Sequence, residues 1–225
     1  QPEGPWPTGT GPADARGPLR AGFPGAAVGG GSLTNFTELN RCRPDPARVD
    51  FVTFGNTAIV HAADDLSVWQ TLEAMPDILA TANEMAAGKP LHLGLFSIGM
   101  RSNPYGAAVA ANPARLRLPM AMDDPRQDTG FAAAYALVVL ARAAVAGVHS
   151  LALAMPGGPL GARGPLADLI RAAAPLFGRE VEVAEAGALV TLAAGEALLD
   201  ANCGPTPAQV GGTTLAPESI ALRLP

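Results

Sequence analysis

Apolar residues along this chain fall into two alternating patterns. Short continuous apolar runs, typical of buried β-strands, alternate with stretches in which apolar residues recur every three or four positions, as on one face of a helix. Strands are predicted at residues 25–32 (ending in a glycine turn), 49–54, 91–98 and 148–155. Helices are predicted at residues 13–23, 66–88, 125–147 and 164–178. The alternation indicates an α/β fold of about four strand–helix units, with a parallel sheet whose two faces are covered.

The two ends of the chain differ from this middle part. Residues 1–12 are rich in proline and glycine and are expected to form a flexible arm. From residue 179 onward, short apolar runs are separated by glycine and proline, which predicts short antiparallel strands packed outside the α/β unit. The expected organisation is therefore an arm (1–12), an α/β domain (13–178) and a β-rich C-terminal appendage (179–225).

Composition narrows the possible partners and location. Apolar residues make up 48% of the 225 residues, which is enough for a core. The net charge is −5 and lysine and arginine do not cluster, so nucleic acid and anionic membranes are not expected partners. No uncharged apolar run is long enough to span a bilayer, and the start lacks the features of a signal peptide. We expect a cytoplasmic protein in which Cys42 and Cys203 are free thiols.

Polar side chains concentrate where strands are predicted to end. In parallel βα units these loops share one rim, where α/β enzymes carry out their chemistry. The polar residues of these loops are Asn35, Glu38, Asn40 and Arg41 after the first strand, Asn56, His61, Asp64 and Asp65 after the second, and Arg101, Asn103, Tyr105, Asp124, Arg126 and Gln127 after the third. Such groups supply a base and hydrogen bonds to hydroxyl and carbonyl groups, which suits a polyhydroxylated substrate. Glu38 and His61 are predicted to lie on the same rim, after neighbouring strands.

Structural roles compete with functional ones at several of these positions. Asp64 or Asp65 precedes a helix and is a candidate N-cap. The string DPRQ fits a capping box that begins at Asp124. His92 and His149 lie near strand starts, away from the rim, and are expected to be structural.

The two candidate bases also have structural alternatives. Glu38 could pair with Arg41 or Arg43, and His61 could bond a backbone carbonyl and nothing more. No metal-ligand spacing, nucleophile elbow, P-loop or dinucleotide fingerprint is found. We therefore expect neither a metal nor a cofactor.

Four strings, in order, carry a resemblance to a known family. They are VGGGSLTNFTELNR, VHAADDLSVWQTLEAMP, IGMRSNPYG and DPRQDTGFAAAYAL. Over about residues 12–160 the chain resembles the D-apionate lactonase family, with a fainter likeness in the tail. The resemblance implies a partial (β/α)8 TIM-barrel-like domain with a small C-terminal antiparallel β appendage. It also implies hydrolysis of the lactone of a branched sugar acid in carbohydrate catabolism. A whole family member is expected to have about four more barrel strands before residue 25.

The resemblance and the rim placement together assign roles. Either Glu38 or His61 is expected to activate water, while Arg101 and backbone amides hold the oxyanion. The expected substrate-binding residues are Asn35, Asn40, Asp64, Asn103, Tyr105 and Arg126.

Two other functions remain open on the sequence. A glycoside hydrolase needs two carboxylates about 5–9.5 Å apart, and only Glu38 is an obvious rim glutamate. A truncated, non-catalytic half-barrel is the third possibility. It would leave strand edges exposed, so a homo-oligomer or a missing N-terminal barrel half is expected as partner. A monomer of this chain is then expected to be weakly active or inactive.

Overall fold

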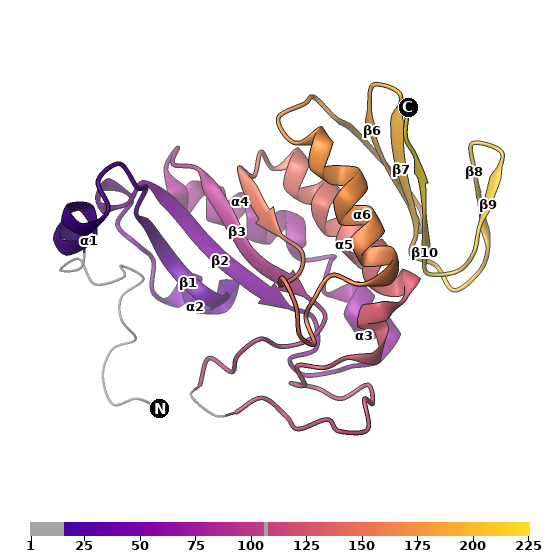
Figure 1. Cartoon of the computed structure of the whole chain (residues 1–225), viewed down its shortest axis with the longest axis horizontal. Helices are drawn as coiled ribbons and strands as arrows, with labels where there is room; N and C mark the ends of the chain where they lie inside the picture. Colours follow the sequence, from indigo (N-terminus) through magenta and orange to yellow (C-terminus); the bar gives the residue numbers. More distant parts are fainter. Residues whose placement is uncertain (1–15, 106–107) are drawn as a thin grey trace.

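The computed structural model describes residues 16–105 and 108–225 and is built in three layers (Figure 1). The first layer is a four-stranded parallel sheet in the order β1-β2-β3-β4. Its strands are β1 (Gly29–Asn35), β2 (Phe51–Thr57), β3 (Leu91–Ser97) and β4 (Ser150–Ala152). The α/β class and the strand–helix alternation are thus as predicted. The expected arm at residues 1–12 lies outside the described residues.

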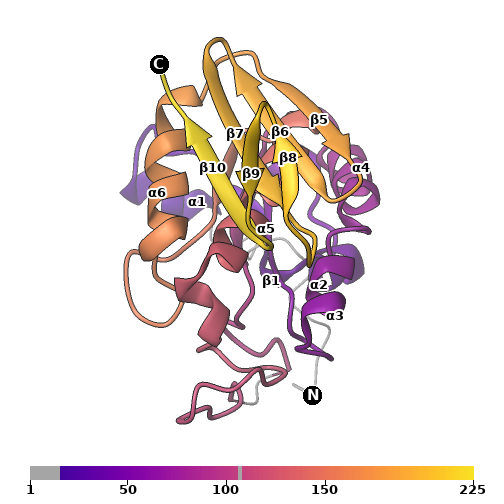
Figure 2. The ribbon, with the colours of Figure 1, turned by 90° about the vertical axis from the view of Figure 1, so that its right-hand side faces the viewer.

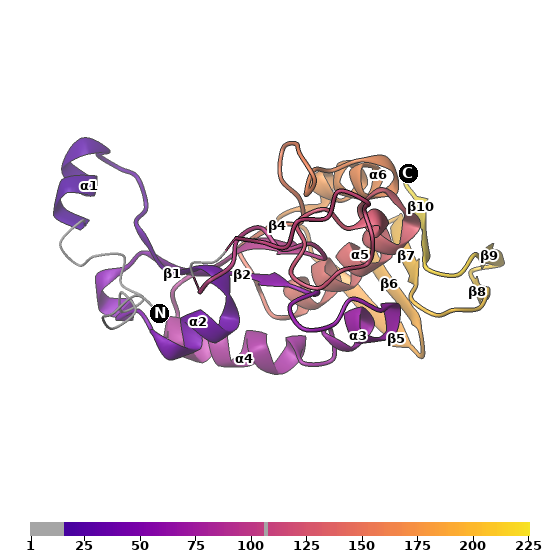
Figure 3. The same ribbon diagram turned by 90° about the horizontal axis from the view of Figure 1, so that it is seen from below.

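Helices form the second layer. They are α1 (Arg16–Gly22), α2 (Phe36–Arg41), α3 (Asp65–Gln70), α4 (Met75–Ala86), α5 (Gly130–Val145) and α6 (Gly164–Ala173), with 3-10 turns η1 (Pro46–Arg48), η2 (Pro125–Asp128) and η3 (Ala174–Leu176). Helices α2, α4 and α5 contact the parallel sheet, and α6 packs beside α5. Helix α1 stands apart from the rest of the molecule (Figure 3) and is tied to it by Arg20, which donates to Asp50.

Three predicted helices are shorter than expected. The one predicted at 164–178 ends as α6 at Ala173 and is followed by the turn η3. The stretch 66–88 forms α3 and α4 with a turn between them, because Pro76 lies in the first turn of α4. Proline has no N–H to donate to the carbonyl four residues earlier, so it ends one helix and begins another. In the stretch 125–147, a 3-10 turn comes first, and α5 begins only after Thr129, whose Oγ1 accepts from the Phe131 amide at 3.3 Å.

The expected glycine turn after the first strand is wrong, because the glycines are part of β1. Gly31 has φ of +142°, and a Cβ there would lie 1.9 Å from the carbonyl oxygen of Thr53 in β2. Glycine therefore allows β1 to approach β2 this closely. The last predicted strand is also shorter than expected, since only Ser150–Ala152 of 148–155 pairs with β3.

The prediction that both faces of the parallel sheet are covered is also wrong. Val52, Phe54 and Leu93 belong to the core on the helical side. Gly31, Thr53, His92 and Ser150 are register partners along a row across the strands, and all are only partly buried. No described helix lies on the near face in Figure 1, and within the described residues β1 and β4 are edge strands. Successive side chains of a strand point to opposite faces of the sheet. One face can therefore be apolar while the other carries small and polar residues.

The third layer is an antiparallel sheet in the order β10-β7-β6-β5. Its strands are β5 (Glu182–Ala186), β6 (Leu189–Ala194), β7 (Ala197–Asn202) and β10 (Ser219–Arg223), and a hairpin of β8 (Ala208–Val210) and β9 (Thr213–Leu215) projects from it (Figure 2). The prediction of short antiparallel strands from residue 179 is confirmed. This sheet packs on the side of α5 away from the parallel sheet.

One charged contact joins the antiparallel sheet to α5. The Arg142 guanidinium donates to both carboxylate oxygens of Glu185, at 3.1 and 2.9 Å. Elsewhere, neither Cys42 nor Cys203 is in a disulfide bond, in line with the prediction. Among the described helices, none combines the length and apolar character that crossing a bilayer requires.

The two structural histidines stack on the uncovered face of the parallel sheet. The His92 ring lies 4.3 Å from the Phe51 ring and 4.8 Å from the His149 ring, and its Nδ1 is 2.9 Å from the Ser150 hydroxyl. Burial, and then the charge of His149, lower the pKa of His92. The folded protein therefore holds a proton on His92 less readily than the unfolded chain does.

We expect the protein to lose stability as the pH falls below about 6.5, the ordinary pKa of histidine. In that range the unfolded chain binds the His92 proton first, so folding becomes less favourable. Unfolding midpoints measured between pH 8 and pH 5 check this. His92→Gln should flatten the pH dependence, whereas His61→Gln, a change at an exposed histidine, should leave it in place. An unchanged slope in His92→Gln would contradict the assignment.

Candidate active site

The carboxyl ends of β1, β2 and β3 enclose a small polar cleft. Its lining residues are Leu33, Thr34, Asn35, Asn56, Thr57, Leu95, Ser97, Arg101 and Ser102. The cleft has a volume of about 10 Å³, which is room for one water molecule. It meets solvent at Leu33, which is 77% exposed. Parallel strands end at the same edge, so three separate chain segments contribute hydroxyl, amide and guanidinium groups to one place.

Glu38 lies directly behind the cleft, in the first turn of α2. Its Oε2 accepts from the Asn35 amide at 3.1 Å and from the Thr34 hydroxyl at 3.3 Å. Thr34 lines the cleft, and its hydroxyl is 2.8 Å from that of Ser32. Glu38 is only 7% exposed, so its carboxylate reaches the cleft through Thr34. The expected pairing with Arg41 is loose, at 4.0 Å.

Arg101 crosses the cleft from the loop after β3. Its Nη2 donates to the backbone carbonyl of Leu33 in β1. Within the described parts of the chain, the Arg101 guanidinium forms no salt bridge with a carboxylate. Asn56, at the end of β2, likewise has no side-chain hydrogen bond among the described residues. These two side chains therefore keep hydrogen-bonding capacity for a ligand.

The loop that carries Arg101 continues toward α2. Asn103 Oδ1 accepts from the Tyr105 amide at 3.0 Å, which shapes the turn. The Tyr105 hydroxyl accepts from Arg41 Nη1 at 3.0 Å, and the Tyr105 side chain is half exposed. Both residues thus lie at the rim, on a segment that links the loop after β3 to the helix after β1.

Three of the predicted site residues have other partners or lie apart from the cleft. Asn40 accepts from Arg43 at 2.6 Å on the surface of α2. Asp64 is the N-cap of α3, as the structural alternative predicted, and accepts from the amide and hydroxyl of Ser67. Those bonds hold the pKa of Asp64 below its ordinary value. His61 follows β2 on the same edge of the sheet as Glu38, as predicted, but it is exposed and does not line the cleft.

Arg126 is the centre of a buried ion network rather than part of the cleft. Its side chain is 3% exposed and donates twice to Asp124, at 2.9 and 2.7 Å, and once to Asp65, at 2.8 Å. The guanidinium also lies 5.1 Å from the centre of the Phe131 ring. Asp124 caps the turn η2 through the Arg126 amide. This arrangement gives Arg126 a structural role.

The network extends to the loops after three strands. Its outer ion pairs are Arg117–Asp65, Arg115–Asp123, Arg115–Asp128 and Arg163–Asp128, at 2.6 to 3.1 Å. Most of these groups are partly exposed, so each pair contributes little alone. Together they tie the loops after β2, β3 and β4 to one another.

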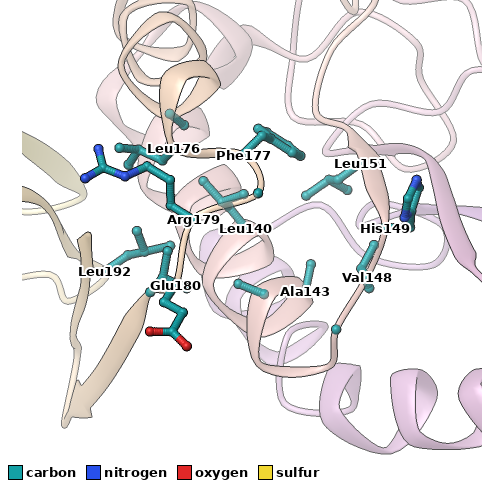
Figure 4. Close-up of a pocket in the computed structure, with 15 residues that line it drawn as sticks. Leu140, Ala143, Val148, His149, Leu151, Leu176, Phe177, Arg179, Glu180 and Leu192 are labelled. Atoms are coloured by element: carbon teal, nitrogen blue, oxygen red, sulfur yellow. The ribbon is translucent and has the colours of Figure 1, made fainter. Parts of the chain in front are cut away.

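A larger cavity of about 700 Å³ lies at the opposite edge of the sheet (Figure 4). It is formed by α5, the end of α6, the start of β4 and the antiparallel sheet, with mainly apolar side chains such as Leu140, Leu176 and Leu192. None of the predicted site residues lines it. Because it adjoins the amino end of β4 through His149, it lies away from the rim where parallel-sheet enzymes place their chemistry.

The cleft therefore combines residues that the sequence identified with others that it did not. Asn35 and Arg101 line it and Glu38 adjoins it, whereas Thr34, Thr57, Ser97 and Ser102 were not identified as site residues. The sequence does contain a signal for three of them, which is a hydroxyl side chain at the carboxyl end of a strand. Thr34, Thr57 and Ser97 each occupy one of the last two positions of their strand. The predicted ends of the first two strands were three residues too early, which hid this signal. Among the described residues, no three His, Cys, Asp or Glu side chains gather closely enough to hold a metal ion.

Comparisons with known proteins agree with the α/β fold. A family model described as the TIM barrel domain of D-apionate lactonase matches residues 1–187. Over 157 residues the chain is 46% identical to a D-apionate lactonase of Brucella anthropi, covering 69% of this chain and 26% of the relative. The chain thus spans about a quarter of that relative's length. The fold is similar to that of a GH51 arabinofuranosidase from Xanthomonas axonopodis pv. citri, with TM-score 0.53 and 9% identity, over 86% of this chain and 49% of the other.

The different surroundings of Arg126 and Arg101 lead to a stability prediction. Arg126→Met should lower the free energy of unfolding by about 3–5 kcal/mol, because it leaves the buried Asp124 carboxylate unpaired. Arg101→Met removes one hydrogen bond to a carbonyl and should change stability by no more than about 1 kcal/mol. Urea denaturation of both variants measures the difference. Equal losses would mean that Arg101 is also structural.

Proposed function

The chain belongs to the D-apionate lactonase family, and we propose that it takes part in hydrolysing the lactone of a branched sugar acid. The observation that carries the proposal is the polar cleft at the carboxyl ends of β1–β3, with Arg101 crossing it and Glu38 behind it. In TIM-barrel enzymes the chemistry takes place at this edge. The substrate partner is then a small carbohydrate lactone.

Arg101 and Glu38 have different roles in this proposal: Arg101 stabilises the oxyanion, and Glu38 is the general base. Arg101 turns from the Leu33 carbonyl to the lactone carbonyl oxygen and stabilises the negative charge that develops there. Glu38 accepts the proton of the attacking water, directly or through the Thr34 hydroxyl that already donates to it. The water oxygen bonds to the carbonyl carbon, the ring C–O bond breaks, and the ring oxygen takes the proton back from Glu38 to become a hydroxyl. The product is an open-chain sugar acid.

Neutral side chains are proposed to orient the sugar. Asn35 and Asn56 line the cleft, and Asn56 has no side-chain partner among the described residues. Amides both donate and accept, which matches the hydroxyl groups of a sugar. Asn103 and Tyr105 are proposed to contact the part of the substrate that extends beyond the rim.

The geometry favours Glu38 over His61 as the base. Glu38 adjoins a cleft residue through a hydrogen bond, whereas His61 is exposed and outside the lining. Asn40, Asp64 and Arg126 have their own protein partners. We propose that these three support the rim rather than bind substrate.

Glycoside hydrolysis is the weaker alternative. It needs a pair of carboxylates about 5–9.5 Å apart, and none of the described residues lining the cleft is a carboxylate. Among the described carboxylates, Glu38 is the one that hydrogen-bonds to lining residues. The likeness to the arabinofuranosidase, at 9% identity, concerns the fold only.

The described sheet supplies one side of a barrel site. Four strands with two unpaired edges do not close an eight-stranded barrel. We propose that the other side comes from further barrel strands or from a second copy of the chain. We further propose the division into an α/β domain (13–178) and a β-rich appendage (179–225), and that the chain alone hydrolyses lactones slowly.

The role of Glu38 is tested by Glu38→Gln. Turnover of D-apionolactone should fall at least about 100-fold, because the variant lacks the base. Glutamine still accepts from the Asn35 amide, so the cap of α2 and the fold should survive. Glu84→Gln, at an exposed position of α4, is the matched control and should keep the rate of the unmodified chain. Turnover that is indifferent to Glu38→Gln would remove Glu38 from the mechanism.

A further inference from the structure

We propose that Arg101 is the receptor for the carboxylate of the open-chain sugar acid, so that the cleft binds the acid more tightly than its neutral lactone. The inference rests on the proposed function and adds that the product acid binds more tightly than the substrate lactone. Its basis is the charge balance of the cleft. Arg101 is the only charged side chain among the described lining residues, and its recorded partner is a neutral carbonyl.

Within the described residues, several other arginines are paired with carboxylates, whereas Arg101 is not. Arg126, Arg142 and Arg163 each form salt bridges with carboxylates. Arg101 instead donates to the Leu33 carbonyl, whose charge is only partial. A guanidinium–carboxylate contact adds the attraction of two full charges to the hydrogen bond, and it can be bidentate. Replacing the Leu33 carbonyl by a ligand carboxylate therefore strengthens the contact.

The nearby acidic group does not cancel the charge of Arg101. Glu38 is behind Thr34, and its Oε2 already accepts from the Thr34 hydroxyl and the Asn35 amide. Arg41 lies 4.0 Å from the same carboxylate. The Glu38 charge is thus partly compensated on its own side, which leaves the cleft itself positive.

The dimensions of the cleft select which part of the ligand enters. A volume of about 10 Å³ holds one water-sized group, so a single carboxylate oxygen enters while the sugar carbons stay outside. Leu33 is 77% exposed and Ser102 is also exposed, so the remaining carbons extend outward past them. The Asn56 amide then meets the first hydroxyl groups. The ligand class is an aldonate, with one carboxylate and several hydroxyls.

The proposed reaction creates this ligand. Hydrolysis turns the neutral ester carbonyl into a carboxylate, with one proton released and the ring oxygen converted to a hydroxyl. The oxygen facing Arg101 therefore gains negative charge as the reaction finishes. The acid product is expected to remain bound and to inhibit further turnover.

Calorimetric titration of the 225-residue chain tests this with three ligands of different charge and hydroxyl content. They are D-apionate, its uncharged primary amide, and acetate. D-apionate should bind about tenfold more tightly than the amide, because its acceptor oxygen carries a full rather than a partial negative charge. It should also bind more tightly than acetate, which lacks hydroxyls.

Variants assign the preference to one side chain. Arg101→Gln should bind D-apionate and the amide equally, and Arg101→Lys should keep part of the preference, because lysine lacks the bidentate fork. Arg179→Gln, at an exposed arginine outside the cleft, should bind like the unmodified chain. Thermal melts confirm that each variant is folded.

Several results would overturn the proposal. They are equal binding of acid and amide, no binding of either, a preference that persists in Arg101→Gln, or binding of acetate as tight as that of D-apionate. Turnover of D-apionolactone on the same samples separates this inference from the proposed function. If D-apionate binds more tightly than the amide but D-apionolactone is not hydrolysed, only the proposed function is contradicted. If D-apionolactone is hydrolysed but acid and amide bind equally, only this inference is contradicted.

Discussion

The burial of α5 between the two sheets is the interaction on which the rest of the structure depends. From Phe131 to Val139 every residue of this helix is buried, because the parallel sheet packs on one side, the antiparallel sheet on the other, and α6 along its length. A helix that is apolar all round is stable only when it is enclosed in this way. The C-terminal sheet is therefore part of the core rather than a detachable addition. The Arg142–Glu185 pair fixes its orientation at the edge of that core.

The first turn of α5 also connects the core to the rim. Thr129 caps the helix directly after the turn η2, which carries Arg126 and the network to Asp65 and Asp124. The acidic and basic groups of this network are paired with one another, and at Arg126–Asp124 the pairing compensates buried charges. What remains for a ligand is a set of hydroxyls and amides, together with Arg101. The paired groups of the network and the polar groups that line the cleft are thus two separate sets, although they are close in the sequence.

The uncovered face of the parallel sheet follows from the same layering. All the helices that contact this sheet lie on one side, as in one half of a barrel wall. The opposite face carries small and polar residues such as Gly31, Thr53 and Ser150, and its two outer strands have unpaired edges within the described residues. Membership of a TIM-barrel family accounts for this shape, since the interior of a barrel is completed only when its strands form a ring.

The sequence by itself determined the alternation of strands and helices, the change to antiparallel strands at residue 179, and the candidates Glu38, Asn35 and Arg101. These features depend on neighbours a few residues apart, whose spacing is visible in the string. Tertiary structure decided the division of the stretch 66–88 at Pro76, the place of the glycines inside β1, and above all the different roles of Arg101 and Arg126. Both arginines follow the third strand, and local pattern does not distinguish them. Arg126 meets Asp65, which is 61 residues away, and Arg101 meets Leu33, which is 68 residues away. Which charge finds a partner is a property of the packed chain, because only folding brings such distant groups within hydrogen-bond distance.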